Sequence, residues 1–236
     1  MGKTIFQQYI GAILFGGVIG TIIYFGQIAG GESALSSVNI SLAATTLFLL
    51  GTVLLLGPLS RLFTVFDWAL KFRKELGIVS FFTALLHVYM VMFPLARNGP
   101  WGLYVSRPWS AYPGLEALII LFVLLLLSWN FTMHVLGTKL WWQIQYWGAR
   151  IAFMLIAVHM VVLKYKTIVS WVIPGQAEAA TAGVHFPPLI IWEAQFVLFI
   201  LVVRLSELFG KDAARRITQG IALIIVTTML WWIFLR

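Results

Sequence analysis

The stretch LGIVSFFTALLHVYMVMFPL, residues 76–95, holds twenty residues without a formally charged side chain. An α-helix rises 1.5 Å per residue, so about twenty apolar residues cross the hydrocarbon core of a bilayer, which is roughly 30 Å thick. The stretch therefore predicts a membrane-spanning helix. It also contains His87, and a titratable imidazole inside an apolar span is costly enough to suggest a functional role.

Apolar stretches of similar length recur along the chain, separated by Gly, Pro and charged residues. Hydrophobic residues make up 61% of the 236 residues, and charged residues only 10%. We therefore expect an all-α polytopic membrane protein, a bundle of about seven transmembrane helices. The predicted spans are residues 8–28, 41–60, 76–95, 113–131, 146–165, 188–209 and 217–235.

The net charge of +8 reflects cations that flank these spans. Because they do not form a stripe on a soluble module, we expect membrane lipid and no nucleic acid as a partner. With a cytoplasmic N-terminus, eleven cations fall on the inner side and five on the outer side, which favours this orientation and an outer C-terminus. The inner set is Lys3, Arg61, Lys71, Arg73, Lys74, Lys139, Arg150, Arg204, Lys211, Arg215 and Arg216; the outer set is Arg97, Arg107, Lys164, Lys166 and Arg236.

A second intramembrane imidazole, His159, lies in RIAFMLIAVHMVVL, residues 150–163. His87 follows Leu76 by eleven residues and His159 follows Tyr146 by thirteen, which puts both rings about 17–20 Å up from the inner side, at similar depths. Cysteine is absent, so any redox chemistry needs a bound cofactor.

Small residues on the same helix faces leave room for a flat macrocycle between the two histidines. They are Ser80, Thr83 and Ala84 near His87, and Gly148 and Ala152 near His159. Small residues also allow close helix packing with nothing between the helices. Two hypotheses stay open here: a histidine pair on haem iron, or two histidines that each hydrogen bond to a neighbouring helix.

Several short motifs occur in a fixed order over residues 41–165. They are Pro58, Leu59 and Arg61 in GPLSRL; Arg73, Lys74, Leu76 and Gly77, with His87 ten residues after the glycine; Arg107, Pro108 and Trp109 in SRPWSAYPG; and Leu136, Gly137 and Trp142, followed by Tyr146 and His159. This order and spacing resemble the ferric reductase-like transmembrane family, and within it the haem-binding membrane subunit of the methionine sulfoxide reductase system.

The resemblance implies one haem b with His87 and His159 on its iron. The predicted topology puts Arg97, Arg107, Lys164 and Lys166 on the outer side, where we expect them near the propionates of a haem held at this depth. It also implies an oxidoreductase component of the bacterial inner membrane that passes electrons from the quinol pool or a separate flavoreductase to a periplasmic reductase subunit. A second haem, a quinone or FMN stays open as a further cofactor. The resemblance divides the chain into an N-terminal helix with an outer loop (1–40), a haem-binding core (41–165) and an outer loop with two C-terminal helices (166–236).

Tyr146 departs from the family, which has a further histidine at this position. Tyrosine can ligate haem iron, but a tyrosine among several tryptophans is more typical of the aromatic belt at the membrane surface. His134, predicted near the inner surface, is interpreted as a water-facing residue and is the remaining imidazole for a second haem. His185 is interpreted as an outer-loop residue.

Two other function classes remain. A small transporter predicts paired broken helices in two related halves, and no internal repeat is visible in the sequence. A haemless structural membrane subunit with the same fold is the second alternative.

Overall fold

The computed structural model describes residues 2–96, 101–173 and 187–234, and this part of the chain is helical with no strand. Seven of its helical segments are long and apolar enough to cross a membrane. Each corresponds to one predicted span, so the prediction of an all-α polytopic membrane protein is confirmed. The segments are Thr4–Ala29, Ala34–Leu62, Thr64–Met92, Pro108–Leu127, Thr138–Trp171, Leu189–Phe209 and Lys211–Phe234.

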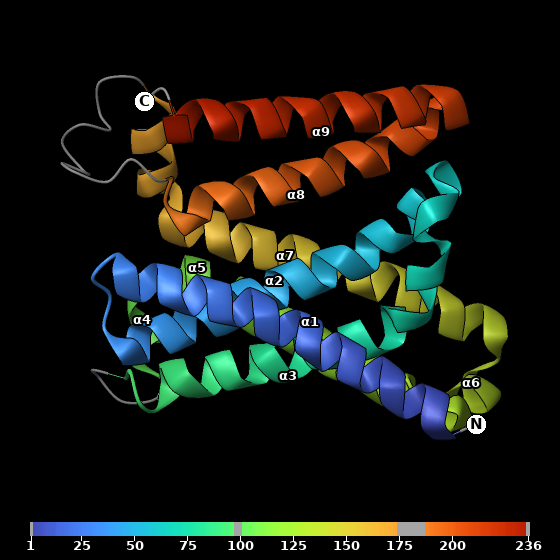
Figure 1. Ribbon diagram of the computed structural model, residues 1–236. Coiled ribbons are helices and arrows are strands. Elements are labelled where there is room, and N and C mark those ends of the chain that lie inside the picture. The colour runs from blue at the N-terminus through green and yellow to red at the C-terminus, as the bar shows by residue number, and fades with distance from the viewer. Residues whose placement is uncertain (1, 97–100, 174–186, 235–236) are drawn as a thin grey trace.

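The long helices run roughly parallel or antiparallel to one another (Figure 1). They are α1 (Gly2–Ala29), α2 (Ala34–Leu62), α3 (Arg73–Met92), α5 (Pro108–Leu127), α7 (Thr138–Val172), α8 (Leu189–Ser206) and α9 (Lys211–Phe234). Shorter elements join them: the 3₁₀ helices η1 (Thr64–Phe72) and η2 (Glu207–Phe209), and the α-helices α4 (Gly102–Ser106) and α6 (Asn130–Leu136).

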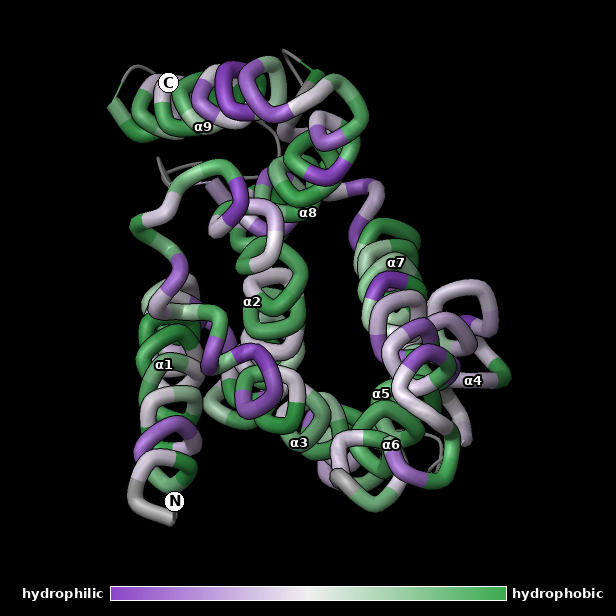
Figure 2. The backbone as a smooth tube through the Cα atoms, turned by 90° about the vertical axis from the view of Figure 1, so that its right-hand side faces the viewer, coloured by the Kyte–Doolittle hydropathy of each residue, from purple (hydrophilic) through white to green (hydrophobic). Residues whose placement is uncertain are grey.

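Helix α2 lies at the centre and packs against α1, α3, α7 and α8. Figure 2 looks nearly along the helices, with hydrophobic residues dominating the spans. The buried leucines of α2, among them Leu47, Leu50 and Leu54, pack with Phe153 of α7 and Ile200 of α8 in one core. In lipid, the hydrophobic effect does not drive helices together, so side-chain packing of this kind sets the positions of the spans relative to one another.

Glycines mark the closest helix approaches. The Phe196 and Ile200 side chains of α8 occupy the space that a Cβ at Gly51 of α2 would need. A Cβ at Gly148 of α7 would lie 2.7 Å from the Leu124 Cδ2 of α5. These contacts hold α8 against α2 and α7 against α5.

The first and last predicted parts of the chain pack on the part between them. Helix α1 contacts α2 and α3, while α8 contacts α2 and α7 and carries α9 on its other side. The division at residues 40 and 165 stays a prediction. Residues 174–186, where the last outer loop is predicted, lie outside the described residues.

Candidate cofactor site

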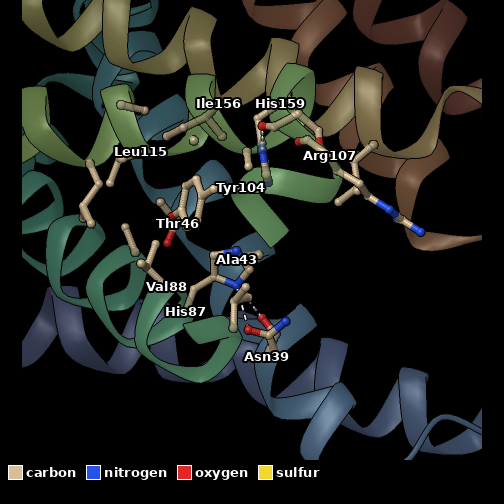
Figure 3. Close-up of a pocket in the computed structure, with 18 of the residues that line it drawn as sticks. Asn39, Ala43, Thr46, His87, Val88, Tyr104, Arg107, Leu115, Ile156 and His159 are labelled. Carbon is tan, nitrogen blue, oxygen red and sulfur yellow. Dashed lines mark hydrogen bonds between the residues drawn. The ribbon is translucent and has the colours of Figure 1, made fainter. Parts of the chain in front are cut away.

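A cavity of about 550 Å³ lies among α2, α3, α4, α5 and α7. Sites for small molecules and cofactors are typically about 300–1,000 Å³ in volume. His87 of α3 and His159 of α7 both line this cavity (Figure 3). The two rings lie close enough for a charge on one to affect the other. The structure thus brings together the two histidines that are far apart in the sequence.

The His87 ring is oriented by Asn39 of α2. His87 Nδ1 lies 2.8 Å from Asn39 Oδ1 and 3.3 Å from the Asn39 backbone oxygen. A backbone carbonyl can only accept a hydrogen bond, so Nδ1 carries the proton and donates it. Nε2 of His87 is then the nitrogen with a free lone pair.

The His159 ring is oriented in the same way by α5. Its Nδ1 lies 2.5 Å from the backbone oxygen of Ser110, which again accepts the proton of Nδ1. The ring lies directly across Gly114, where a Cβ would be 3.0 Å from Nδ1 and 3.3 Å from Cε1. The glycine therefore provides the space in which the imidazole sits.

Both imidazoles are thus held as Nδ1–H tautomers with Nε2 available, the arrangement found when a histidine ligates a metal. Among the residues that the structure describes, no group of three or more His, Cys, Asp or Glu residues could hold a bare metal ion. A bare ion such as zinc needs at least three protein ligands, whereas an iron already held by a macrocycle needs only axial ones. Two histidines with free Nε2 atoms on one cavity are a donor set that would fit haem iron.

The rest of the cavity wall is made largely of small and apolar residues. Ala43 of α2, Ala84 of α3 and Ala117 of α5 are examples. Tyr104 of α4 also lines the cavity, and burial raises the pKa of its phenol. The phenol therefore stays neutral and can both donate and accept a hydrogen bond.

Four of the five small residues expected beside the histidines serve helix packing instead. Ser80 donates to the Thr46 backbone oxygen at 3.2 Å, and the Thr83 and Thr46 hydroxyls lie 2.9 Å apart, so both join α3 to α2. Gly148 and Ala152 lie in the packed core of α7. Only Ala84 lies on the cavity wall. A helical projection gives a residue's face but not which neighbour that face meets, so it left both alternatives open. Helix packing, the second alternative, applies to all of these residues except Ala84.

The cationic residues expected at the outer end have different positions. Arg107 lines the cavity and is exposed, and Figure 3 shows its side chain extending away from the two imidazoles. Arg97 lies outside the described residues, as does His185. Lys164 and Lys166 are exposed near the end of α7. Of Arg107, Lys164 and Lys166, which the structure describes, only Arg107 lines the cavity.

Tyr146 lies in an aromatic cluster well away from the cavity. Its ring stacks on Trp142 with centroids 4.7 Å apart, and the Arg150 guanidinium lies 3.2 Å from its centroid. Thirteen helical residues, about 20 Å of rise, separate it from His159. His134 is exposed on α6. Neither residue lines the cavity, and their interpretation as surface residues stays a prediction.

Sequence reasoning missed Asn39, Tyr104, Ser110 and Gly114. Asn39 falls just before the predicted span 41–60, but α2 begins earlier because Ser33 caps it by accepting a hydrogen bond from the Ser36 amide at 3.3 Å. Ser110 contributes only its backbone oxygen, which leaves no side-chain signal. No protein-family model matches this sequence, and no curated protein is significantly similar to it.

Proposed function

We propose that this chain is a haem b membrane protein that carries electrons across its membrane, in which His87 and His159 would hold the haem. One observation carries the proposal: both Nδ1–H groups donate to oxygen atoms of neighbouring helices, and both rings line one cavity. Donation from Nδ1 fixes the ring and makes Nε2 a better ligand.

The chain's own residues would bind and shield the group. His87 and His159 would hold it from two sides, Asn39 and the Ser110 carbonyl would keep both rings in the ligating tautomer, and the alanines would keep water out. When bound, haem would supply a one-electron redox centre. Ligation by His87 and His159 together would suit electron transfer better than oxygen activation.

Electrons must be exchanged with other molecules. The described part of the chain contains no strand, so it offers no strand-turn-helix site for a nicotinamide or flavin dinucleotide. The resemblance to the ferric reductase-like family favours the quinol pool or a separate flavoreductase as donor, and a periplasmic reductase subunit as acceptor. The location is then the bacterial inner membrane, with the cation-rich end of the bundle in the cytoplasm. Quinone or FMN as a further cofactor belongs to the same hypothesis. A second haem held near His134 or Tyr146 is the alternative, and haem loss in variants of these two residues would favour it.

A reduced-minus-oxidised visible spectrum of the purified protein tests the proposal. We expect a b-type α band, which a small transporter or a haemless structural subunit would lack. His87→Ala and His159→Ala should each remove most of the haem, and the double variant should be little worse, because two axial ligands act as a unit. The matched controls His134→Ala and His185→Ala should keep it. Full six-coordinate haem in His87→Ala would overturn the assignment.

The orientation has its own test. Fusion of a reporter that is active only in the cytoplasm to the C-terminus should give no activity if the seven spans and the charge bias are interpreted correctly. A reporter that is active in the periplasm should give a signal at the same position. Activity of the cytoplasmic reporter would contradict the orientation without affecting the haem assignment.

A further inference from the structure

A second polar centre lies at the cation-rich end of the bundle, where α2 and α8 end and α3 begins. It begins with Pro58 in α2, which has no N–H to donate to the carbonyl of Leu54, four residues earlier. The Arg204 Nη2 of α8 donates to this Leu54 oxygen instead. Arg204 thus satisfies a backbone group that the proline leaves unpaired within a membrane span.

The carboxylate of Glu207, in η2, is shared by two arginines. Its Oε2 accepts from Arg204 Nη1 at 3.1 Å, and its Oε1 forms an ion pair with Arg61 Nη2 at the end of α2. In the part of the chain that the structure describes, these are the salt bridges. Glu207 is therefore engaged on both of its oxygens.

Two further arginines lie close to this pair. Arg73 of α3 lies within electrostatic range of Arg61 and Arg204, and its Nη1 would be 3.8 Å from a Cβ at Gly57. Arg150 of α7 lies within range of Arg204 and Arg73 and donates to the Tyr146 backbone oxygen at 2.7 Å. We call Arg61, Arg73, Arg150 and Arg204 the arginine group.

The arginine group carries more positive charge than its surroundings balance. Arg61 and Arg204 are paired with Glu207, and Arg73 and Arg150 are close enough for their charges to act on Arg204, so four guanidinium groups meet where one carboxylate is ion-paired. Two other carboxylates lie at this end and reduce the excess without pairing with an arginine: Asp67, which accepts from the Ser60 hydroxyl at 2.5 Å, and Glu75, whose buried Oε2 makes no hydrogen bond. Like charges repel strongly where the surroundings are partly apolar. An anion bound among these guanidinium groups would offset that repulsion.

One donor of the group has no acceptor. Arg204 Nε is buried and makes no hydrogen bond, although Nη1 and Nη2 of the same side chain are both bonded. Buried N–H groups are rarely left without a partner, and a bound ion or water is one common explanation for such a group. This atom indicates a missing acceptor beside Arg204, independently of the charge excess.

We infer that the arginine group binds a phosphate group at the level of the lipid headgroups. Guanidinium forks match the geometry of phosphate oxygens and bind them with two hydrogen bonds each. Trp142 and Tyr146, beside Arg150, are typical of this depth, and basic pockets between cytoplasmic helix ends bind anionic headgroups. The phosphate could come from an anionic lipid or from a soluble phosphate compound. The inference does not depend on haem.

Native mass spectrometry of the purified full-length protein in a neutral detergent tests this inference. The probes are phosphatidylglycerol, phosphatidylcholine and inorganic pyrophosphate, each added separately. We expect one phosphatidylglycerol to be retained per chain, with about tenfold weaker retention of the net-neutral phosphatidylcholine. Retention of phosphatidylglycerol alone identifies a lipid as the source, whereas retention of pyrophosphate identifies a soluble compound. If the wild-type protein retains neither anion above phosphatidylcholine, the inference is wrong.

Variants locate the site. Arg73→Gln with Arg150→Gln should weaken anion retention at least about tenfold, because charge-assisted hydrogen bonds to phosphate are lost while Arg204 keeps its structural partners. Arg216→Gln removes a charge from an exposed residue at the same end of the bundle and should retain the anion. Equal loss in Arg216→Gln would show nonspecific surface attraction and overturn the site. Glu207→Gln should bind more tightly, a gain that misfolding cannot produce.

Discussion

Replacement of Gly114 by alanine tests whether the His159 ring must lie where the structure has it. The new Cβ would be 3.0 Å from Nδ1 and 3.3 Å from Cε1 of that ring. Both distances are shorter than ordinary van der Waals contacts, so the ring would have to move by a few tenths of an ångström. The movement would weaken the 2.5 Å hydrogen bond from Nδ1 to the Ser110 oxygen.

The expected effect on haem is larger than the effect on folding. Loss of a hydrogen bond that orients a ligating histidine typically costs about 10–100-fold in metal affinity, or roughly 1.4–2.8 kcal/mol. We therefore expect Gly114→Ala to bind haem about 10–100-fold more weakly. Overpacking of the α5–α7 contact should also lower the free energy of unfolding by about 1–3 kcal/mol. Spectroscopic titration of the haem-depleted protein with haem measures the first quantity, and thermal unfolding in detergent the second.

Gly148→Ala is the matched control on the same helix pair. Its Cβ would meet Leu124 Cδ2 at 2.7 Å, so it disturbs the packing of α7 on α5 without contacting the imidazole of His159. We expect a similar loss of stability and near-normal haem affinity. Wild-type haem affinity in Gly114→Ala, or an equal loss of haem in Gly148→Ala, would refute the idea that Gly114 provides the space for a ligating ring.

Three further variants test other parts of the structure. Asn39→Leu should weaken haem binding about tenfold and raise the midpoint potential of the haem, because the His87 imidazole loses the Asn39 amide oxygen as acceptor and becomes a weaker donor to iron. A potentiometric titration identical to that of the wild type would contradict this. Tyr146→Phe should leave the haem content measured by absorbance unchanged, since the ring lies in an aromatic cluster, and haem loss in folded protein would make it a ligand. Pro58→Ala restores an N–H that can donate to the Leu54 carbonyl, so Arg204→Leu should destabilise Pro58→Ala less than it destabilises the wild type. Thermal unfolding of the single and double variants should give an interaction energy of about 0.5–3 kcal/mol, and purely additive effects would exclude the hydrogen bond from Arg204 to Leu54.

The spans were predictable because the bilayer fixes a minimum apolar length, but their ends were not. Helix α7 runs over Thr138–Val172, well beyond the predicted 146–165, because a helix can continue past the hydrocarbon with polar and aromatic residues such as Trp142 and Lys166. Likewise, α2 begins at Ala34 because Ser33 caps it. A hydropathy pattern detects the lipid-facing part of a helix and does not detect its extension into the interface.

The histidine pair was predictable, whereas the groups that orient it were not. His87 and His159 are conspicuous because polar side chains are rare in apolar segments. Asn39 lies in a stretch that looks like a loop by composition, and Ser110 acts through a backbone oxygen that every residue possesses. Which carbonyl meets which ring depends on the packing of α5 against α7, and that packing is set by contacts such as Gly148 with Leu124.

Arg204 shows why an intramembrane charge needs its neighbours before it can be interpreted. A cation in an apolar span suggests transport or catalysis by default, yet here the proline of a neighbouring helix supplies the reason for its position. Pro58 and Arg61 belong to GPLSRL, and each depends on the C-terminal part of the chain. The Leu54 carbonyl, which Pro58 leaves without a donor, accepts from Arg204, and Arg61 forms an ion pair with Glu207. Without α8 and η2, a backbone carbonyl would be unpaired in an apolar span and Arg61 would lose its carboxylate. The span Leu189–Phe209 therefore completes the polar bonding of α2 even though it carries no recognisable motif.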